Sequence, residues 1–201
     1  GGRGIGLSIA KSLTKEGVGV VIADAGVSID GSDPNPTVAQ AAASEIGGSA
    51  VAFSESITSP SAAKALVDYA IESFGRLDII VNNAAILRDG FIFKGNPTDW
   101  DSVISTNLSA AYYLLSAATP LLRANSKNTN DYKCGRIVNI TSTAGFYGNF
   151  GQAAYSSTKA GLFGLTRAVA LDMARSGITC NAVAPFAATR VTETIQPAND
   201  S

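Results

Sequence analysis

The sequence contains no histidine, and it has only two cysteines and one methionine among its 201 residues. The absence of histidine excludes Ser-His-Asp and Cys-His nucleophile systems and every imidazole metal site. The cysteines, Cys134 and Cys180, form no CxxC pair, so neither a zinc knuckle nor a disulfide scaffold is predicted. We therefore expect a protein without a metal site in a reducing compartment, either the cytoplasm or, in a eukaryote, the peroxisomal or mitochondrial matrix.

Charged residues are also scarce, at 15%, and 15 Lys and Arg nearly balance 16 Asp and Glu. This balance leaves no basic surface for a run of phosphates, so no nucleic-acid partner is predicted. No apolar run approaches the ~18 residues of a membrane helix, and no signal-peptide pattern opens the chain, so no membrane association is predicted. Because residue 1 is glycine and the sole methionine is Met173, we expect the chain to be clipped at its ends.

Short apolar runs that predict buried strands alternate with segments of helical periodicity, which is the pattern of βαβ units around a parallel sheet. The length suits one such domain, residues 1–201. We predict a doubly wound α/β fold with helices on both faces of the sheet. The expected strands are Val18–Ala23, Ala50–Phe53, Leu77–Val81, Arg136–Ile140 and Ile178–Val183; the expected helices are Ala39–Ile46, Ser61–Phe74, Asp101–Leu122 and 152–175, with a polar loop at Asn125–Cys134.

The chain opens with a glycine-rich loop, Gly1-Gly2-Arg3-Gly4-Ile5-Gly6, followed by an amphipathic segment. Such a loop brings backbone N–H groups and a helix N-terminus to a pyrophosphate, and glycine allows the close approach. Asp24 follows the strand Val18–Ala23, where a carboxylate can accept hydrogen bonds from both ribose hydroxyls of an adenosine. Its charge also repels a 2′-phosphate, so we expect NAD to be favoured over NADP, although Arg3 is a nearby cation that argues the other way. A tight turn and an acidic strand cap are the alternative readings.

Tyr155 and Lys159 lie four residues apart in a predicted helix and therefore on one face. A phenol near its reference pKa of ~10 is a poor base at neutral pH, and a nearby ammonium lowers that pKa. The pair can therefore act as an acid and base without histidine. Ser142, just beyond the strand Arg136–Ile140, could hold a substrate carbonyl or alkoxide. Taken alone, the pair could be an ordinary amphipathic pair and the serine a turn former.

Together, these residues resemble the short-chain dehydrogenase/reductase family over nearly the whole chain. The family's TGxxxGxG loop is matched by Gly1 to Gly6 without its leading Thr-Gly, and its NNAG motif by Asn82-Asn83-Ala84-Ala85. Asn107, Ser142, Tyr155 and Lys159 match its remaining motif positions in order. A closer resemblance, to (3R)-hydroxyacyl-CoA dehydrogenase domains of peroxisomal multifunctional enzymes, rests on three further segments: Ala85–Asp89, Tyr147–Gln152 and Thr189–Thr192.

The resemblance implies a Rossmann-like fold and a mechanism. Tyr155 would exchange the proton at the substrate oxygen, and Ser142 would hold that oxygen. Lys159 would lower the Tyr155 pKa and bind the nicotinamide ribose, and Asn107 would hold a water that relays protons to Lys159. The cofactor-binding residues it implies are Gly2, Arg3, Gly4, Ile5, Gly6, Asp24, Ser56, Ile57, Asn83, Ala84, Ala85, Tyr155, Lys159 and Pro185.

Several positions depart from the family pattern. The resemblance implies a strand before Gly1 at the centre of the sheet and a substrate-binding segment that continues after Ser201, and both are absent from these residues. Ala85 replaces the last glycine of NNAG, and Ser56-Ile57 stands where the family has Asp-Val against the adenine. Pro185-Phe186 replaces Pro-Gly. The bulky phenylalanine is expected to reshape the nicotinamide end or line the substrate pocket.

The leading hypothesis is an NAD-dependent oxidoreductase that interconverts a secondary alcohol and a ketone, with a 3-hydroxyacyl thioester as substrate. Phe146, Phe150 and Phe186 could supply apolar walls for an acyl chain, or could be core residues. The alternatives are a 3-oxoacyl carrier-protein reductase, a steroid or polyol dehydrogenase, and, from another class, a module that senses NAD without turnover. The resemblance also implies a homodimer or homotetramer paired through the helices Asp101–Leu122 and Gln152–Arg175.

Overall fold

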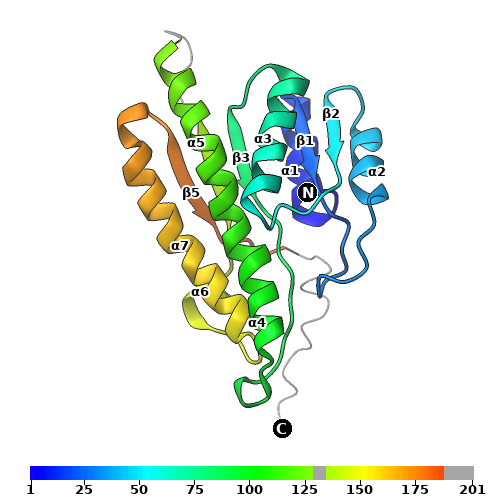
Figure 1. The fold of residues 1–201 in the computed structure, drawn as a ribbon, viewed down its shortest axis with the longest axis vertical. Helices are drawn as coiled ribbons and strands as arrows, with labels where there is room; N and C mark the ends of the chain where they lie inside the picture. The colour runs from blue at the N-terminus through cyan, green and yellow to red at the C-terminus, as the bar shows by residue number, and fades with distance from the viewer. Residues whose placement is uncertain (129–134, 188–201) are drawn as a thin grey trace.

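The protein, seen here as a computed structural model, is described for residues 1–128 and 135–187. Five strands alternate with helices along this part of the chain (Figure 1). The strands are β1 Val20–Ala23, β2 Ala50–Phe53, β3 Ile79–Asn82, β4 Arg136–Ile140 and β5 Thr179–Val183. The α-helices are α1 Gly4–Lys15, α2 Thr37–Ile46, α3 Pro60–Phe74, α4 Pro97–Ile104, α5 Ala110–Asn128, α6 Ala144–Tyr147 and α7 Ala153–Met173.

The strands form two parallel sheets, β1-β2 and β3-β4-β5. Val21 lies opposite Val51 in the first sheet, and Ile80 lies opposite Ile137 in the second. Parallel neighbours need long crossover connections, and the intervening helices supply them. The predicted parallel α/β architecture is therefore confirmed.

Strand β1 shows why helices cover both faces, because its neighbouring side chains point to opposite sides. Ile22 packs with the alanines of α1 and α2, whereas Val21 packs into the larger core with Leu66 and Val67 of α3. That larger core also takes in Leu115 of α5 and Met173 of α7. In Figure 1, α3, α5 and α7 lie across the near face of the strands, with α1 behind β1.

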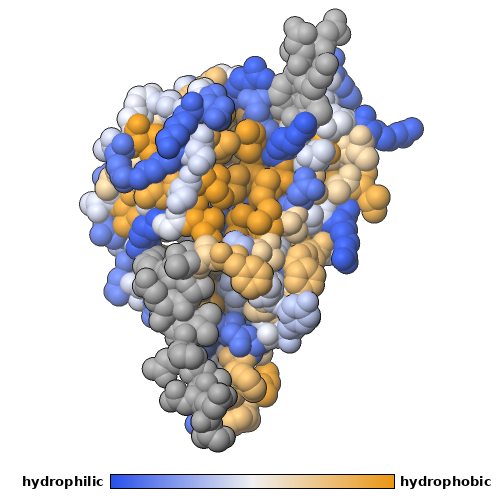
Figure 2. Space-filling view, turned by 180° about the vertical axis from the view of Figure 1, so that it is seen from behind, coloured by the Kyte–Doolittle hydropathy of each residue, from blue (hydrophilic) through white to orange (hydrophobic). Residues whose placement is uncertain are grey.

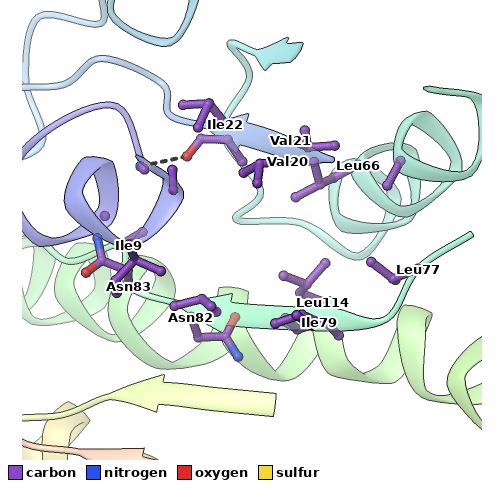
Figure 3. Close-up of a pocket in the computed structure, with 18 of the residues that line it drawn as sticks. Ile9, Val20, Val21, Ile22, Leu66, Leu77, Ile79, Asn82, Asn83 and Leu114 are labelled. Atoms are coloured by element: carbon purple, nitrogen blue, oxygen red, sulfur yellow. Dashed lines mark hydrogen bonds between the residues drawn. The ribbon is translucent and has the colours of Figure 1, made fainter. Parts of the chain in front are cut away.

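An apolar cavity of about 590 Å³ separates the two sheets. Figure 3 shows its walls: Val20, Val21 and Ile22 of β1 on one side and Ile79 of β3 on the other, with Leu66 and Leu114 reaching in from α3 and α5. Among the described residues, no strand lies between β1 and β3. Seen from behind, apolar side chains gather at the centre of the molecule (Figure 2). This space between β1 and β3, called the slot below, lies where the resemblance placed the strand before Gly1.

The prediction of one long helix at Asp101–Leu122 is the largest error among the predicted elements. The structure divides it into α4, a π-helical segment at Ser105–Ser109 and α5. The loop expected at Asn125–Cys134 is wrong at its start, because α5 continues to Asn128. The strand expected from Val18 begins at Val20, and the short helix α6 was not predicted. Cys134 and the Thr189–Thr192 motif lie outside the described residues.

Local signals explain where α3 and α4 begin. The Ser59 side chain accepts a hydrogen bond from the Ala62 amide, and Asn96 does the same for the Thr98 amide. In both helices proline follows the cap at the first helical position, where its missing N–H costs nothing. No helix among the described residues is long and apolar enough to cross a membrane.

Candidate active site

The predicted site residues gather around a second cavity, of about 1080 Å³, at the carboxyl ends of the strands. Ligands bind at this edge of open parallel α/β sheets. The predicted residues that line the cavity are Arg3, Gly4, Ile5, Asp24, Ser56, Ile57, Asn83, Ala84, Ala85, Ser142, Tyr155, Lys159 and Pro185. Gly2, Gly6 and Asn107 do not line this cavity; Gly2 and Gly6 lie in the glycine loop, and Asn107 lies in the π-helical segment.

The glycine loop packs too closely for larger residues. Gly4 has φ +53°, a conformation that L side chains rarely adopt. A Cβ on Gly6 would lie 2.8 Å from Asn83 Nδ2, and a Cβ on Gly2 would lie 3.0 Å from Val38. Helix α1 begins here without a side-chain cap, so its first amides are available to an anion. The loop therefore fits the pyrophosphate of a dinucleotide.

Asp24 lies beside this loop, as predicted. Its Oδ2 accepts hydrogen bonds from the Gly2 amide at 2.8 Å and from the Gly1 nitrogen at 3.0 Å, and its Oδ1 accepts one from Gly26 at 2.7 Å. Burial raises the pKa of this carboxyl, but its hydrogen bonds from the nitrogens of Gly1, Gly2 and Gly26 lower it, and the pKa is lowered overall. Asp24 is therefore an anion at neutral pH.

Arg3 places a cationic side chain near this carboxylate. Its Nη2 lies 3.8 Å from Asp24 Oδ1 and donates to the Val27 carbonyl at 2.6 Å. The buried Nε of Arg3 has no hydrogen-bond partner in the structure. Asp24, whose carboxylate favours NAD, and Arg3, whose guanidinium favours NADP, thus both line the cavity.

Ser142, Tyr155 and Lys159 meet where β4 ends and α7 begins. Ser142 follows the strand and caps the turn by accepting from the Ala144 amide at 3.2 Å. Tyr155 lies in the first turn of α7, and its hydroxyl is hydrogen bonded to Ser142. Lys159 is 2% exposed, and its Nζ donates to the Ile140 carbonyl at 2.8 Å and lies 5.5 Å from the centre of the Tyr155 ring. The structure therefore brings the three predicted residues together.

The pKa of Tyr155 differs from the expectation drawn from the sequence. Burial raises the pKa of Tyr155, a nearby Asp89 raises it further, and only the hydrogen bond from Ser142 lowers it. Burial lowers the pKa of Lys159 to about 8. In this arrangement Lys159 donates to Ile140, and the expected lowering of the Tyr155 pKa by Lys159 is not found.

Asn107 is 1% exposed, and both ends of its side-chain amide contact the backbone of Ile86. Its Oδ1 accepts from the Ile86 amide at 2.8 Å, and its Nδ2 donates to the Ile86 carbonyl at 2.9 Å. The residue therefore joins the π-helical segment to the loop after β3. A π-helical turn in an α-helix is frequently found at a functional site, and each end of the amide keeps one further hydrogen-bonding position.

The prediction that three phenylalanines form apolar walls of the cavity is partly wrong. Phe186 lines the cavity and is 91% exposed. Phe146 instead packs on Phe163 of α7, with ring centroids 4.0 Å apart, and Phe150 does not line the cavity. Tyr147, which the sequence reasoning missed, does line it. Arg88 and Gln152 were also missed as cavity residues, although both lie in segments that carry the closer resemblance.

Comparison with known proteins agrees with this geometry. The short chain dehydrogenase family model matches residues 1–200. A short-chain type dehydrogenase/reductase of Mycobacterium tuberculosis is 40% identical over 98% of the chain and 67% of its own length. The peroxisomal hydratase-dehydrogenase-epimerase of Saccharomyces cerevisiae is 38% identical over 98% of the chain, which spans only 21% of that enzyme.

A solved structure is similar as well. The 3-ketoacyl-(acyl-carrier-protein) reductase of Brucella melitensis, complexed with NADH, superimposes with a TM-score of 0.82 at 28% identity. The match covers 92% of this chain and 72% of that one. The chain belongs to the short-chain dehydrogenase/reductase family. It is a nicotinamide-dependent oxidoreductase that acts on the CH–OH group of a small-molecule substrate.

Proposed function

We propose that this enzyme transfers hydride between NAD(H) and a 3-hydroxyacyl or 3-oxoacyl thioester, with acyl-CoA as the preferred form. The observation that carries the proposal is the meeting of Ser142, Tyr155 and Lys159 in one cavity with the glycine loop and Asp24. A module that only senses NAD has no use for this acid–base group. The Brucella melitensis relative supports the acyl substrate, because it is a 3-ketoacyl reductase.

The residues of this chain suit reduction of a ketone as follows. Ser142 donates a hydrogen bond to the substrate oxygen and holds it beside Tyr155. As negative charge develops on that oxygen, the Tyr155 hydroxyl donates its proton to it. In oxidation the same proton returns to Tyr155. The raised pKa of Tyr155 keeps this phenol protonated at neutral pH, which suits the reductive direction.

NAD(H), when bound, supplies the hydride acceptor or donor. The glycine loop and the first amides of α1 would hold its pyrophosphate, with Ile5 beside them. Asp24 would bind the adenosine ribose, and Ser56 and Ile57 would lie against the adenine. Asn83, Ala84, Ala85 and Pro185 would flank the nicotinamide end, where Lys159 would bind the second ribose.

An apolar rim at the mouth of the cavity supports an acyl substrate. Tyr147 and Phe186 are 88% and 91% exposed there, and large exposed apolar side chains beside a pocket are typical of a ligand surface. A 3-oxoacyl carrier-protein reductase is the second candidate, because the similar Brucella melitensis protein is a 3-ketoacyl-(acyl-carrier-protein) reductase. The two candidates share the reacting group and differ in the carrier.

The test is reduction of a 3-oxoacyl-CoA by wild type and Tyr155→Phe in the presence of NADH. We expect turnover to fall at least ~100-fold in the variant, the scale of one proton-transfer group, while NADH binding is retained. Wild-type turnover with 3-oxoacyl carrier protein but not with the CoA ester would favour the second candidate. NADH binding without turnover on either carrier would overturn the proposed function.

We also propose that the enzyme is a homodimer or homotetramer that pairs through the long helices. Tyr112 of α5 and Leu171 of α7 are 55% and 79% exposed, which supports a covered face on these helices. Light scattering of the purified protein is expected to give a dimeric or tetrameric mass. A monomeric mass at assay concentration would contradict this.

A further inference from the structure

Asp89 and Gln152 join two segments that bracket the catalytic tyrosine. Gln152 is 4% exposed, and its Nε2 donates to Asp89 Oδ2 at 2.9 Å. Its Oε1 accepts from Asn149 Nδ2 at 3.1 Å, so both ends of the amide are used. An amide can satisfy both neighbours in only one orientation, because a carboxylate only accepts hydrogen bonds. The side chain of Gln152 is therefore fixed.

The backbone reinforces this contact. The Gly90 amide donates to the Gly151 carbonyl at 2.8 Å, and Gly90 and Gln152 form an isolated parallel bridge. The Gln152 carbonyl in turn accepts from the Ser156 amide at 2.8 Å as the first bond of α7. The loop after β3 is thus tied to the turn of helix that carries Tyr155.

Two ionic groups lie near Tyr155 on different elements. Lys159 is on α7 with its Nζ 5.5 Å from the centre of the Tyr155 ring, and the Asp89 carboxylate, on the loop after β3, acts on the phenol through its charge. The neighbouring Arg88 does not neutralise Asp89, because its guanidinium is engaged by Asp99 and the Asp30 carbonyl. Among the described residues, the neutral Ser142 hydroxyl also acts on the phenol, through a hydrogen bond.

We propose that Asp89, held by Gln152, is a positioning residue that ties the loop after β3 to the first turn of α7 and so seats Tyr155 for the reduction of the ketone. The inference rests on the proposed role of Tyr155. Removal of the Asp89 charge favours the phenolate, so Tyr155 should lose its proton at lower pH. Loss of the Gln152 contact should instead loosen the first turn of α7 without removing the charge.

The test compares Asp89→Asn, Asp89→Glu and Gln152→Leu in the full chain with saturating cofactor. Asp89→Asn keeps a hydrogen-bond acceptor for Gln152, so we expect the rising limb of kcat against pH in alcohol oxidation to move down by about half a pH unit, with KM for cofactor unchanged. Asp89→Glu should restore the wild-type midpoint. Gln152→Leu should lower kcat several-fold without moving the midpoint.

Asp68→Asn is the matched control, because it removes one carboxylate on α3 that pairs with exposed Lys64. An Asp89→Asn midpoint identical to wild type, or an equal shift in Asp68→Asn, would overturn the inference. Asp89→Ser provides a second charge-removing variant should Asp89→Asn fold poorly. A wild-type enzyme that turns over and fails only in this test contradicts the role of Asp89, whereas one without turnover contradicts the proposed function.

Discussion

Asp24 uses one carboxylate for two tasks, since it closes the glycine loop and faces the cofactor cavity. Its bonds to Gly2 and Gly26 fix the loop, and its charge repels a 2′-phosphate. We expect Asp24→Asn to shift the ratio of NADH to NADPH affinity toward NADPH at least ~10-fold, which corresponds to ~1.4 kcal/mol. Fluorescence titration with each cofactor measures this ratio.

Asp33→Asn is the control for this change, because Asp33 is exposed on the same loop and its φ of 51° is one that asparagine accepts. The control should leave the cofactor ratio unchanged. A ratio in Asp24→Asn equal to wild type, in a variant with unaltered melting temperature, would show that the carboxylate does not select the cofactor.

The positions of individual site residues were the part of the site that the sequence predicted best. The placement of Asp24, Tyr155 and Lys159 followed from spacing alone, because a strand end and one face of a helix fix where a side chain lies. Side-chain partners did not follow in the same way. Spacing places Lys159 near Tyr155, but the Ile140 carbonyl that captures its ammonium belongs to a strand nineteen residues earlier in the chain.

At the scale of elements, the buried strands were predicted well because β-branched runs bounded by glycine and polar residues leave few alternatives. The division of Asp101–Leu122 was missed, because a π-helical turn barely disturbs a pattern of apolar residues. Its cause is tertiary: Asn107 bonds both backbone groups of Ile86, from a loop twenty-one residues earlier. Helix α6, at four residues, is too short to carry a periodic signal.

The errors in predicting which aromatic residues line the cavity also come from local and tertiary structure that the sequence pattern does not show. Phe146, Tyr147 and Phe150 are close in sequence, and hydrophobicity alone favours the two phenylalanines for an apolar wall. The turn of α6 decides otherwise, because it directs Phe146 onto Phe163 and places Tyr147 at the cavity. Which side chain faces a ligand thus depends on a local turn that composition does not reveal.

At the scale of the whole molecule, the strands of the two sheets are not hydrogen bonded to each other in the described part of the chain. Core residues from β1, α3, β3 and α5 belong to one apolar cluster that reaches across the slot. The carboxyl ends of β1 and β3 both reach the 1080 Å³ cavity, at Asp24 and at Asn83. The strands therefore run in the same direction, and a strand placed between them would be parallel to both.

The slot should accept a strand supplied before Gly1. We expect an added segment of about five β-branched residues, the usual strand length, to pair with β1 and β3 and to bury two or three side chains at ~1.5–3 kcal/mol each. Ordering the backbone costs ~1–2 kcal/mol per residue, which the new ladder bonds and the side chains must exceed. A net gain of about 2 kcal/mol would raise Tm by roughly 4–8 °C.

A Gly/Ser extension of equal length is the control, because it lengthens the chain without apolar side chains to fill the slot. Calorimetry should place the β-branched version above both this control and the parent chain. Cofactor affinity should rise with it, since the added strand ends at the glycine loop and fixes Gly1 and Gly2 against Asp24. Equal melting temperatures for the two extensions would mean that the space between the sheets is not a strand site.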